Sequence, residues 1–334
     1  MKETARQLLA LDCAREVSNI TEQIRAILAH RLHRRGLVVA ISGGIDSSVC
    51  AALAVRAIGR GKVLGLLMPE QDSSPQSLER GYQLAEHLGI DHLVEDIAPV
   101  LEAIGCYRWR DDAIRSLFPD YGPDWKNKIV ISGGLQGKIN HFNLVVEAPD
   151  GRRQVKRLPL RAYLTIVAAT NHKQRVRKTL EYFHADRLNY AVVGTPNRLE
   201  HDQGFFVKNG DGSADIKPIA HLYKSQVYAL ATHLELPTAI CQASPTTDTY
   251  SLPQGQDELY FALPYQQLDV ALWCRDHGKT AAQAADYLGI IETQAELIYR
   301  DIDRKRSTTR YQHAHPCLIE PVNETSPAEA VYER

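Results

Sequence analysis

Six residues of a candidate anion-binding loop follow a short apolar run that extends from Leu37 to Ile41. They are Ser42, Gly43, Gly44, Asp46, Ser47 and Ser48. Two glycines let the backbone adopt positive φ and come close to a ligand, and the N-terminus of a following helix offers free N–H groups with a partial positive charge. The serines add hydroxyl donors. These residue types in this order predict a loop that holds a phosphate or a pyrophosphate.

This loop differs from the nucleotide loop of kinases and GTPases, which needs G-x-x-x-x-G-K-[ST] and a lysine that reaches the phosphates. No lysine follows here, and Asp46 lies among the proposed phosphate ligands. A carboxylate beside phosphates requires a bridging cation, and Mg²⁺ is the predicted one. Residues 131–134 repeat the sequence Ile-Ser-Gly-Gly, but neither an aspartate nor a helical pattern follows. That copy is predicted to be a hairpin turn.

A second group of candidate residues follows another apolar run, residues 189–193. Residues 194–200 read Gly-Thr-Pro-Asn-Arg-Leu-Glu, and residues 205–219 then mix acids, lysines and glycines before Lys224. Such a mixture in one loop region suits a site where a metal, phosphates and a carboxylate meet.

Elements that could position both groups alternate along the chain. Strands are predicted at 37–41, 63–68, 91–96 and 188–194, and helices at 5–35, 48–58, 75–88, 98–106, 162–186 and 223–236. Alternating strands and helices indicate βαβ units and an α/β fold with a doubly wound, mostly parallel sheet. Ligands of such sheets bind beyond the carboxyl ends of the strands, where both candidate groups lie. Residues 255–310 are predicted to be helical.

Residues 107–160 interrupt this alternation. Tyr107, Trp109 and Trp125 lie in a polar stretch predicted to be loop, and short strands are expected at 128–132, 141–148 and 152–158. We therefore expect a β-rich insertion at 107–160, a core formed by residues 1–106 and 161–312, and a polar tail at 313–334. The insertion could be a lid, a dimer extension, a wall of the acceptor pocket or a surface elaboration without catalytic role.

The composition excludes several classes of protein. Lys and Arg number 39 and Asp and Glu 40, which gives a net charge of −1 and argues against nucleic acid as the main partner. No signal peptide and no apolar run long enough to span a membrane is found, so a cytoplasmic protein is expected. The six cysteines form no C-x-x-C pair and are expected to be reduced thiols.

Taken together, the motifs resemble those of the NAD synthetase family, within the superfamily of N-type ATP pyrophosphatases. The family carries S-G-G-x-D-S, G-T-x-N-[KR]-x-E, F-x-K-x-G-D-G-x-A-D, a following Y-K and N-x-x-x-R-x-R, and matching residues begin at positions 42, 194, 206, 223 and 171. Pro245 to Asp248 matches P-[ST]-A-D except at Thr247. The resemblance covers roughly residues 10–105 and 160–312.

The resemblance implies an adenine nucleotide alpha hydrolase-like fold and an ATP-dependent amidation. A carboxylate would attack the α-phosphate, pyrophosphate would leave, and ammonia would convert the acyl-adenylate into an amide. The implied reaction is nicotinic acid adenine dinucleotide plus ammonia to NAD, with Mg²⁺ as cofactor. The resemblance also implies a homodimer. A glutaminase would need a few hundred further residues, so free ammonia or a separate glutaminase is expected.

The family's site residues carry over to this sequence position by position. Metal ligands would be Asp46 and Glu200. Pyrophosphate and ATP would contact Ser42, Gly43, Gly44, Ser47, Ser48, Thr195, Lys224 and Thr246. The second substrate would contact Arg175, Arg177, Lys208, Asp211 and Asp215. Catalytic roles would fall to Asp46, Lys224, Asp215 and Asp248, with the last two as candidates to capture ammonium.

Other interpretations remain open at this point. Lys208, Arg175 and Arg177 could form ordinary ion pairs, and Thr195, Thr246 and Asp211 could serve local turns. The enzyme could amidate another carboxylate by the same mechanism. A thiolating pyrophosphatase would want catalytic cysteines and a basic face for RNA. A nucleotide binder without activity would not need both Asp46 and Glu200.

Overall fold

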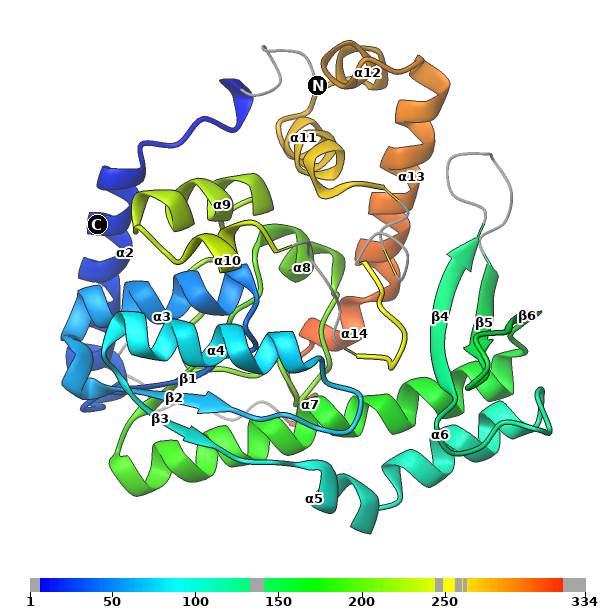
Figure 1. Cartoon of the computed structure of the whole chain (residues 1–334). Coiled ribbons are helices and arrows are strands. Elements are labelled where there is room, and N and C mark those ends of the chain that lie inside the picture. The colour runs from blue at the N-terminus through cyan, green and yellow to red at the C-terminus, as the bar shows by residue number, and fades with distance from the viewer. Residues whose placement is uncertain (1–6, 133–140, 244–248, 256–259, 261–262, 321–334) are drawn as a thin grey trace.

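The computed structural model describes residues 7–132, 141–243, 249–255, 260 and 263–320. Its central element is a four-stranded parallel sheet in the order β3-β2-β1-β7 (Figure 1). The strands are β1 (Leu37–Ala40), β2 (Val63–Leu67), β3 (Asp91–Val94) and β7 (Ala191–Val193). Val38 of β1 pairs with Leu64 of β2 on one side and Val192 of β7 on the other. The predicted α/β fold with a parallel sheet is confirmed.

Helices cover both faces of this sheet, which explains why β1, β2 and β7 are runs of apolar residues rather than alternating ones. One face packs against α2 (Cys13–Ala26), α3 (Ile45–Ile58), α4 (Pro75–Leu88) and α9 (Lys224–His233). The other packs against α5 (Ala98–Ala103), α6 (Cys106–Arg115) and α7 (Leu160–Leu188), as Figure 1 shows.

The strand order indicates where on the sheet a ligand would bind. From β1 the chain continues through α3 to β2 on one side, whereas β7 lies on the other side of β1. The carboxyl ends of β1 and β7 therefore lie next to each other, at the point where the strand order changes direction. Such a switch point is where open α/β sheets bind ligands.

The C-terminal half adds a helical layer with its own core, as predicted for residues 255–310. Leu268, Ala271, Ile298 and Ile302 are buried in it. Its helices and the connecting ones are α8 (Arg198–Gln203), α10 (Thr238–Cys241), α11 (Tyr265–Asp276), α12 (Ala281–Leu288), α13 (Glu292–Thr308) and α14 (Arg310–His313).

The interruption between α6 and α7 contains a three-stranded antiparallel sheet of β4 (Lys126–Ser132), β5 (His141–Glu147) and β6 (Arg153–Arg157). Ile129 and Leu144 of this sheet pack with Ile166 of α7. The three predicted strands are therefore present. The hairpin turn predicted at Gly133 and Gly134 lies outside the described residues.

Two sequence predictions were wrong in detail. The stretch around Tyr107 and Trp109 is not a loop but α6, whose buried face carries Tyr107, Arg110 and Ile114 at helical spacing. A buried arginine among charged neighbours hides this pattern. The first helix does not run through from residue 5 to 35. It begins at Cys13, capped by Asp12, and its last part is a π-helix, η1 (Ile27–Leu32); a short 3-10 turn, η2 (Arg60–Lys62), precedes β2.

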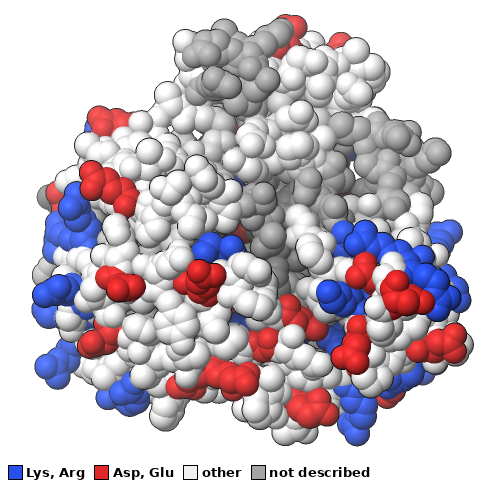
Figure 2. All heavy atoms as spheres, viewed as in Figure 1, with Lys and Arg blue, Asp and Glu red and all other residues white. Residues whose placement is uncertain are grey.

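Charged side chains of both signs are intermixed over the face shown in Figure 2. Among the described residues, no helix is long and apolar enough to cross a bilayer.

Candidate active site

The glycine loop connects β1 to α3 in a conformation fixed by its own hydrogen bonds. Gly44 caps α3, and the hydroxyl of Ser47 donates to the Gly44 carbonyl at 3.0 Å. The Gly44 N–H donates in turn to the Ser42 hydroxyl at 3.3 Å. Because α3 begins directly after the loop, its free N–H groups and positive dipole end face the same space. The loop is thus shaped for an anion before any ligand binds.

Gly43 is required for this shape. Its φ is +74°, and a Cβ there would lie 2.2 Å from the carbonyl oxygen of Ser77. Gly44 has φ −92°, and its Cβ would meet only the Ser42 hydroxyl, at 3.3 Å. The two adjacent glycines therefore differ in how much they tolerate a side chain.

We expect Gly43→Ala to lower the free energy of unfolding by about 1–3 kcal/mol, because it combines a left-handed φ with a backbone clash. Thermal unfolding and the KM for ATP would measure the effect, and the KM should rise as the loop distorts. Gly44→Ala is the matched control, with a loss below about 1 kcal/mol. Equal losses in both variants would contradict the assigned loop geometry.

Asp46, Lys224, Asn197 and Glu200 form one polar cluster at the switch point. The ammonium of Lys224 is paired with one carboxylate oxygen of Asp46, and the side-chain amide of Asn197 donates to the other at 3.1 Å. The backbone N–H of Asn197 donates to the Glu200 carboxylate, also at 3.1 Å. Asn197 therefore joins the two acids that follow β1 and β7. The sequence did not single it out, although it lies within the motif of residues 194–200.

Electrostatics in this cluster keep Lys224 charged. Its side chain is almost fully buried, which by itself lowers the pKa of an ammonium. The negative charges of Asp46 and Glu200 outweigh that burial and raise the pKa. Burial raises the pKa of the Cys50 thiol, and the charges of Asp46 and Glu200 raise it further, so the neutral thiol is favoured.

A cavity of about 560 Å³ opens beside this cluster and extends toward α7 and β5. Its volume lies within the range usual for small-molecule sites. Twelve residues predicted for the site line it: Ser42, Gly43, Gly44, Asp46, Ser47, Arg175, Arg177, Thr195, Glu200, Lys208, Asp211 and Lys224.

The cations and the acid predicted for the second substrate are held by backbone atoms. Arg175 donates to the carbonyl of Lys208 at 3.3 Å, and Arg177 donates to that of Met68 at 3.2 Å. The ammonium of Lys208 donates to the Tyr311 carbonyl at 2.9 Å and lies over the Tyr311 ring. Asp211 accepts the Val207 N–H at 2.7 Å, and burial raises its pKa.

Two predicted residues lie elsewhere. Asp215 is exposed, accepts the Val192 N–H at 2.7 Å beside β7 and is not among the residues that line the cavity. Ser48 is fully buried, and its hydroxyl donates to the Gly44 carbonyl at 2.8 Å. Ser48 is thus bonded within the first turn of α3 and is not among the residues that line the cavity. Thr246 and Asp248 lie outside the described residues.

The cavity also has walls that sequence reasoning did not assign. Arg80 of α4 donates to the Gly43 carbonyl at 2.9 Å, and no motif pointed to it. Ile129 and Phe142 come from the interrupting sheet, and Phe142 stacks on Tyr163 with ring centroids 4.4 Å apart. The interruption is therefore part of the cavity, which excludes a surface elaboration remote from the site.

Comparisons with known proteins agree with this geometry. The family model described as NAD synthase matches residues 16–114 and 148–315. The chain is 55% identical to the NH(3)-dependent NAD(+) synthetase of Rhizobium meliloti (strain 1021), over 95% of each chain.

Two solved structures share the fold at low sequence identity. The NMN synthetase from Francisella tularensis has a TM-score of 0.64 at 22% identity, over 92% of this chain and 99% of that one. The NH3-dependent NAD synthetase from Campylobacter jejuni has a TM-score of 0.61 at 20% identity, over 93% and 100%. At these identities they show the fold alone.

With a family model that covers most of the sequence and a relative that is more than half identical over nearly its whole length, the chain belongs to the NAD synthase family and has its adenine nucleotide alpha hydrolase-like fold.

Proposed function

We propose that this chain is an ammonia-dependent NAD synthetase, which converts nicotinic acid adenine dinucleotide, ATP and ammonia into NAD, AMP and pyrophosphate. The observation that carries the proposal is the polar cluster in which Lys224 pairs with Asp46 and Asn197 links Asp46 to Glu200, beside a glycine loop that contains no lysine. The curated relative named above, which is named for the same reaction, supports it.

Residues of this cavity suit the adenylation step. A carboxylate oxygen of the acceptor attacks the α-phosphorus. The bond between that phosphorus and the oxygen that bridges it to the β-phosphate breaks. The loop N–H groups and the hydroxyls of Ser42 and Ser47 receive the departing pyrophosphate. Lys224 neutralises the negative charge that grows on the transferring phosphoryl group, and it does so at low cost because the cavity already holds it charged. Ammonia then attacks the carbonyl, and AMP leaves.

We further propose Asp46 and Glu200 as ligands of Mg²⁺. The described residues contain no cluster of three or more His, Cys, Asp or Glu side chains that could hold a metal alone. Two carboxylates suit Mg²⁺, which is commonly bound by one or two protein carboxylates together with substrate phosphates. When bound with ATP, the ion would neutralise phosphate charge.

Roles for the second substrate follow the cavity lining. Arg175, Arg177 and Lys208 supply positive charge for an anionic dinucleotide, whereas Thr195, next to β7, is proposed as a contact of ATP. Asp248 remains our proposed carboxylate for ammonium. The position of Asp215 supports a role in attaching its own loop to β7, not in catalysis. Thr246 remains a proposed ATP contact.

Incubation of the protein with ATP, Mg²⁺, ammonium and nicotinic acid adenine dinucleotide tests this function. AMP, pyrophosphate and NAD should appear in equal amounts. Nicotinic acid mononucleotide and other carboxylates serve as alternative acceptors, because Ile129 and Phe142 of the interrupting sheet shape part of the cavity. AMP formation with one of those acids alone would assign a different acceptor. Pyrophosphate formation without any carboxylate would argue against an amide ligase.

We propose a homodimer that buries exposed apolar side chains of α7. Leu160 and Leu164 lie one helical turn apart and are each more than half exposed, and exposed apolar clusters commonly mark association sites. Sedimentation equilibrium should give twice the 37.4 kDa of one chain. Leu164→Glu should yield the monomer, whereas Ile291→Glu, at another exposed apolar position, should leave the dimer intact. A monomeric unaltered protein would contradict this assembly.

Three further assignments are proposed with the function. Free ammonia is the amide donor, with a separate glutaminase as its possible source. The six cysteines are free thiols, which supports a reducing cytoplasmic compartment. The core comprises residues 1–106 and 161–312, with the insertion at 107–160 and the tail at 313–334. The gap in the family match at 115–147 supports an insertion, while α6 packs with the core helices.

A further inference from the structure

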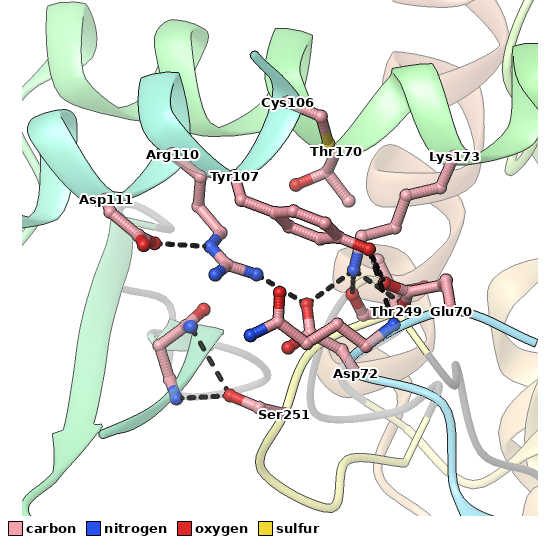
Figure 3. Close-up of polar contacts among 12 residues, drawn as sticks. Glu70, Asp72, Cys106, Tyr107, Arg110, Asp111, Thr170, Lys173, Thr249 and Ser251 are labelled. Carbon is pink, nitrogen blue, oxygen red and sulfur yellow. Dashed lines mark hydrogen bonds and ion pairs between the residues drawn. The ribbon is translucent and has the colours of Figure 1, made fainter. Parts of the chain in front are cut away.

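A buried ion network links the connection after β2 to α6 and α7. The ammonium of Lys173 donates to Glu70 at 2.9 Å and to Asp72 at 2.6 Å. Arg110 of α6 is paired with Asp72 and with Asp111. Figure 3 shows these side chains converging from separate elements. Most of them are buried, so each charge depends on its partners.

The third hydrogen bond of Lys173 reaches outside this network. Its ammonium donates to the backbone carbonyl of Thr249 at 2.9 Å (Figure 3). An ammonium has three N–H donors, so Lys173 is fully used and is not free to bind a substrate. One of its three bonds therefore fixes the start of the 249–254 segment.

Strand β4 fixes the same segment from the other side. The Asn127 N–H donates to the Ser251 hydroxyl at 2.8 Å, and the Leu252 N–H donates to the Asn127 carbonyl at 3.1 Å. Lys128 donates to the Pro253 carbonyl at 3.2 Å, and Gln254 donates to the Ile129 carbonyl. The interrupting sheet and the core helix α7 thus hold this segment between them.

The 249–254 segment forms part of the cavity wall. Thr249 and Tyr250 line the cavity, and Tyr250 packs with Ile129 and Phe142 of the interrupting sheet. These apolar side chains belong to a core cluster separate from the one around the glycine loop. The segment therefore shapes a part of the cavity away from the glycine loop, and we place the acceptor there.

We propose that Lys173 and Asn127 are positioning residues that hold the 249–254 segment from two sides and so shape the acceptor end of the cavity. This assigns a task to the interrupting sheet, which is to fasten from the side of β4 a cavity wall that α7 holds from the other side. The kinetic part of the proposal rests on the proposed function. The structural part does not.

Ser251→Ala tests the proposal with little risk to folding, because it removes one hydroxyl acceptor. Lys173→Met, in contrast, would remove the cation paired with buried Glu70 and one of the two cations paired with Asp72, and it risks unfolding the chain. Thr280→Ala is the matched control: its hydroxyl accepts the Gln283 N–H at the start of α12, and Thr280 does not line the cavity.

Two measurements test the proposal: amide hydrogen exchange of the substrate-free protein and the KM values during turnover. In Ser251→Ala, amide hydrogen exchange of a peptide covering residues 249–254 should speed up about tenfold, the loss expected for one hydrogen bond. The KM for the acceptor should rise by about the same factor, while the KM for ATP stays within about twofold. Thr280→Ala should lower the Tm and change neither quantity.

Unchanged exchange in Ser251→Ala would overturn the structural part whatever the enzyme's substrate is. Equal rises of both KM values would overturn the assignment to the acceptor end. Because exchange is measured without turnover, failure of the proposed reaction and failure of this inference are distinguishable.

Discussion

Asp46→Asn is expected to reduce pyrophosphate release by about 10²–10³-fold or more, the scale found when one preorganised electrostatic contact to a transition state is lost. The amide keeps the size of the side chain and still offers an oxygen to Lys224, so the fold should persist. The variant lacks the negative charge that raises the pKa of Lys224. It also lacks the carboxylate that we propose as a ligand of Mg²⁺.

Asp276→Asn is the matched control for this change. Asp276 also pairs with cations, Arg198 and Arg306, but it lies in the helical layer and does not line the cavity. Its amide variant should retain turnover within about twofold, as expected for an exposed pair. Equal turnover in the two variants would contradict the role of Asp46. A drop in Tm confined to Asp46→Asn would also argue against a catalytic role of Asp46, because the lost activity would then reflect unfolding.

Lys224→Met should lower kcat by about 10²–10³-fold, because no other cation is paired with Asp46 among the described residues and the charge on the transferring phosphoryl group loses its neutralising partner. Methionine preserves the buried stem, and Asp46 keeps its hydrogen bond from Asn197. The effect should therefore fall on catalysis more than on stability. Single-turnover measurement of pyrophosphate release separates it from product release.

The control for Lys224 is Lys62→Met, an exposed lysine just before β2, at the end of the sheet opposite the site. This variant should match the unaltered protein in rate and Tm. If Lys224→Met also kept its rate, the cation that stabilises the leaving group would have to be sought among Arg175, Arg177 and Lys208, which line the same cavity.

Local patterns predicted the elements that carry the site. The apolar runs before Ser42 and Gly194 predict buried strands. The glycines that follow each run predict a loop at the carboxyl end of the strand. Asp46 and Glu200 could be placed near each other because ends of parallel strands share one edge of a sheet. The strand order that makes β1 and β7 neighbours is a long-range property that no local pattern contains.

Side-chain direction was beyond the sequence. Ser48 and Asp215 belong to the same motifs as residues that face the cavity, yet the Ser48 hydroxyl bonds within the first turn of α3 and Asp215 bonds to β7. Membership in a motif fixes the backbone more than it fixes each side chain. The hydrogen bond between Asn127 and Ser251 joins residues 124 positions apart, so no local pattern could predict it. The helix α6 was not predicted because its buried face includes the charged residue Arg110.

Transfer of ¹⁸O from the acceptor to AMP tests directly whether the carboxylate attacks the α-phosphorus of ATP. With both carboxylate oxygens labelled, attack on the α-phosphorus and later release of AMP leave one labelled oxygen in AMP and one in the amide product. We expect labelled AMP and unlabelled pyrophosphate by mass spectrometry. Label in inorganic phosphate, or AMP without label, would show that the carboxylate does not take the nucleotide and would contradict this expectation.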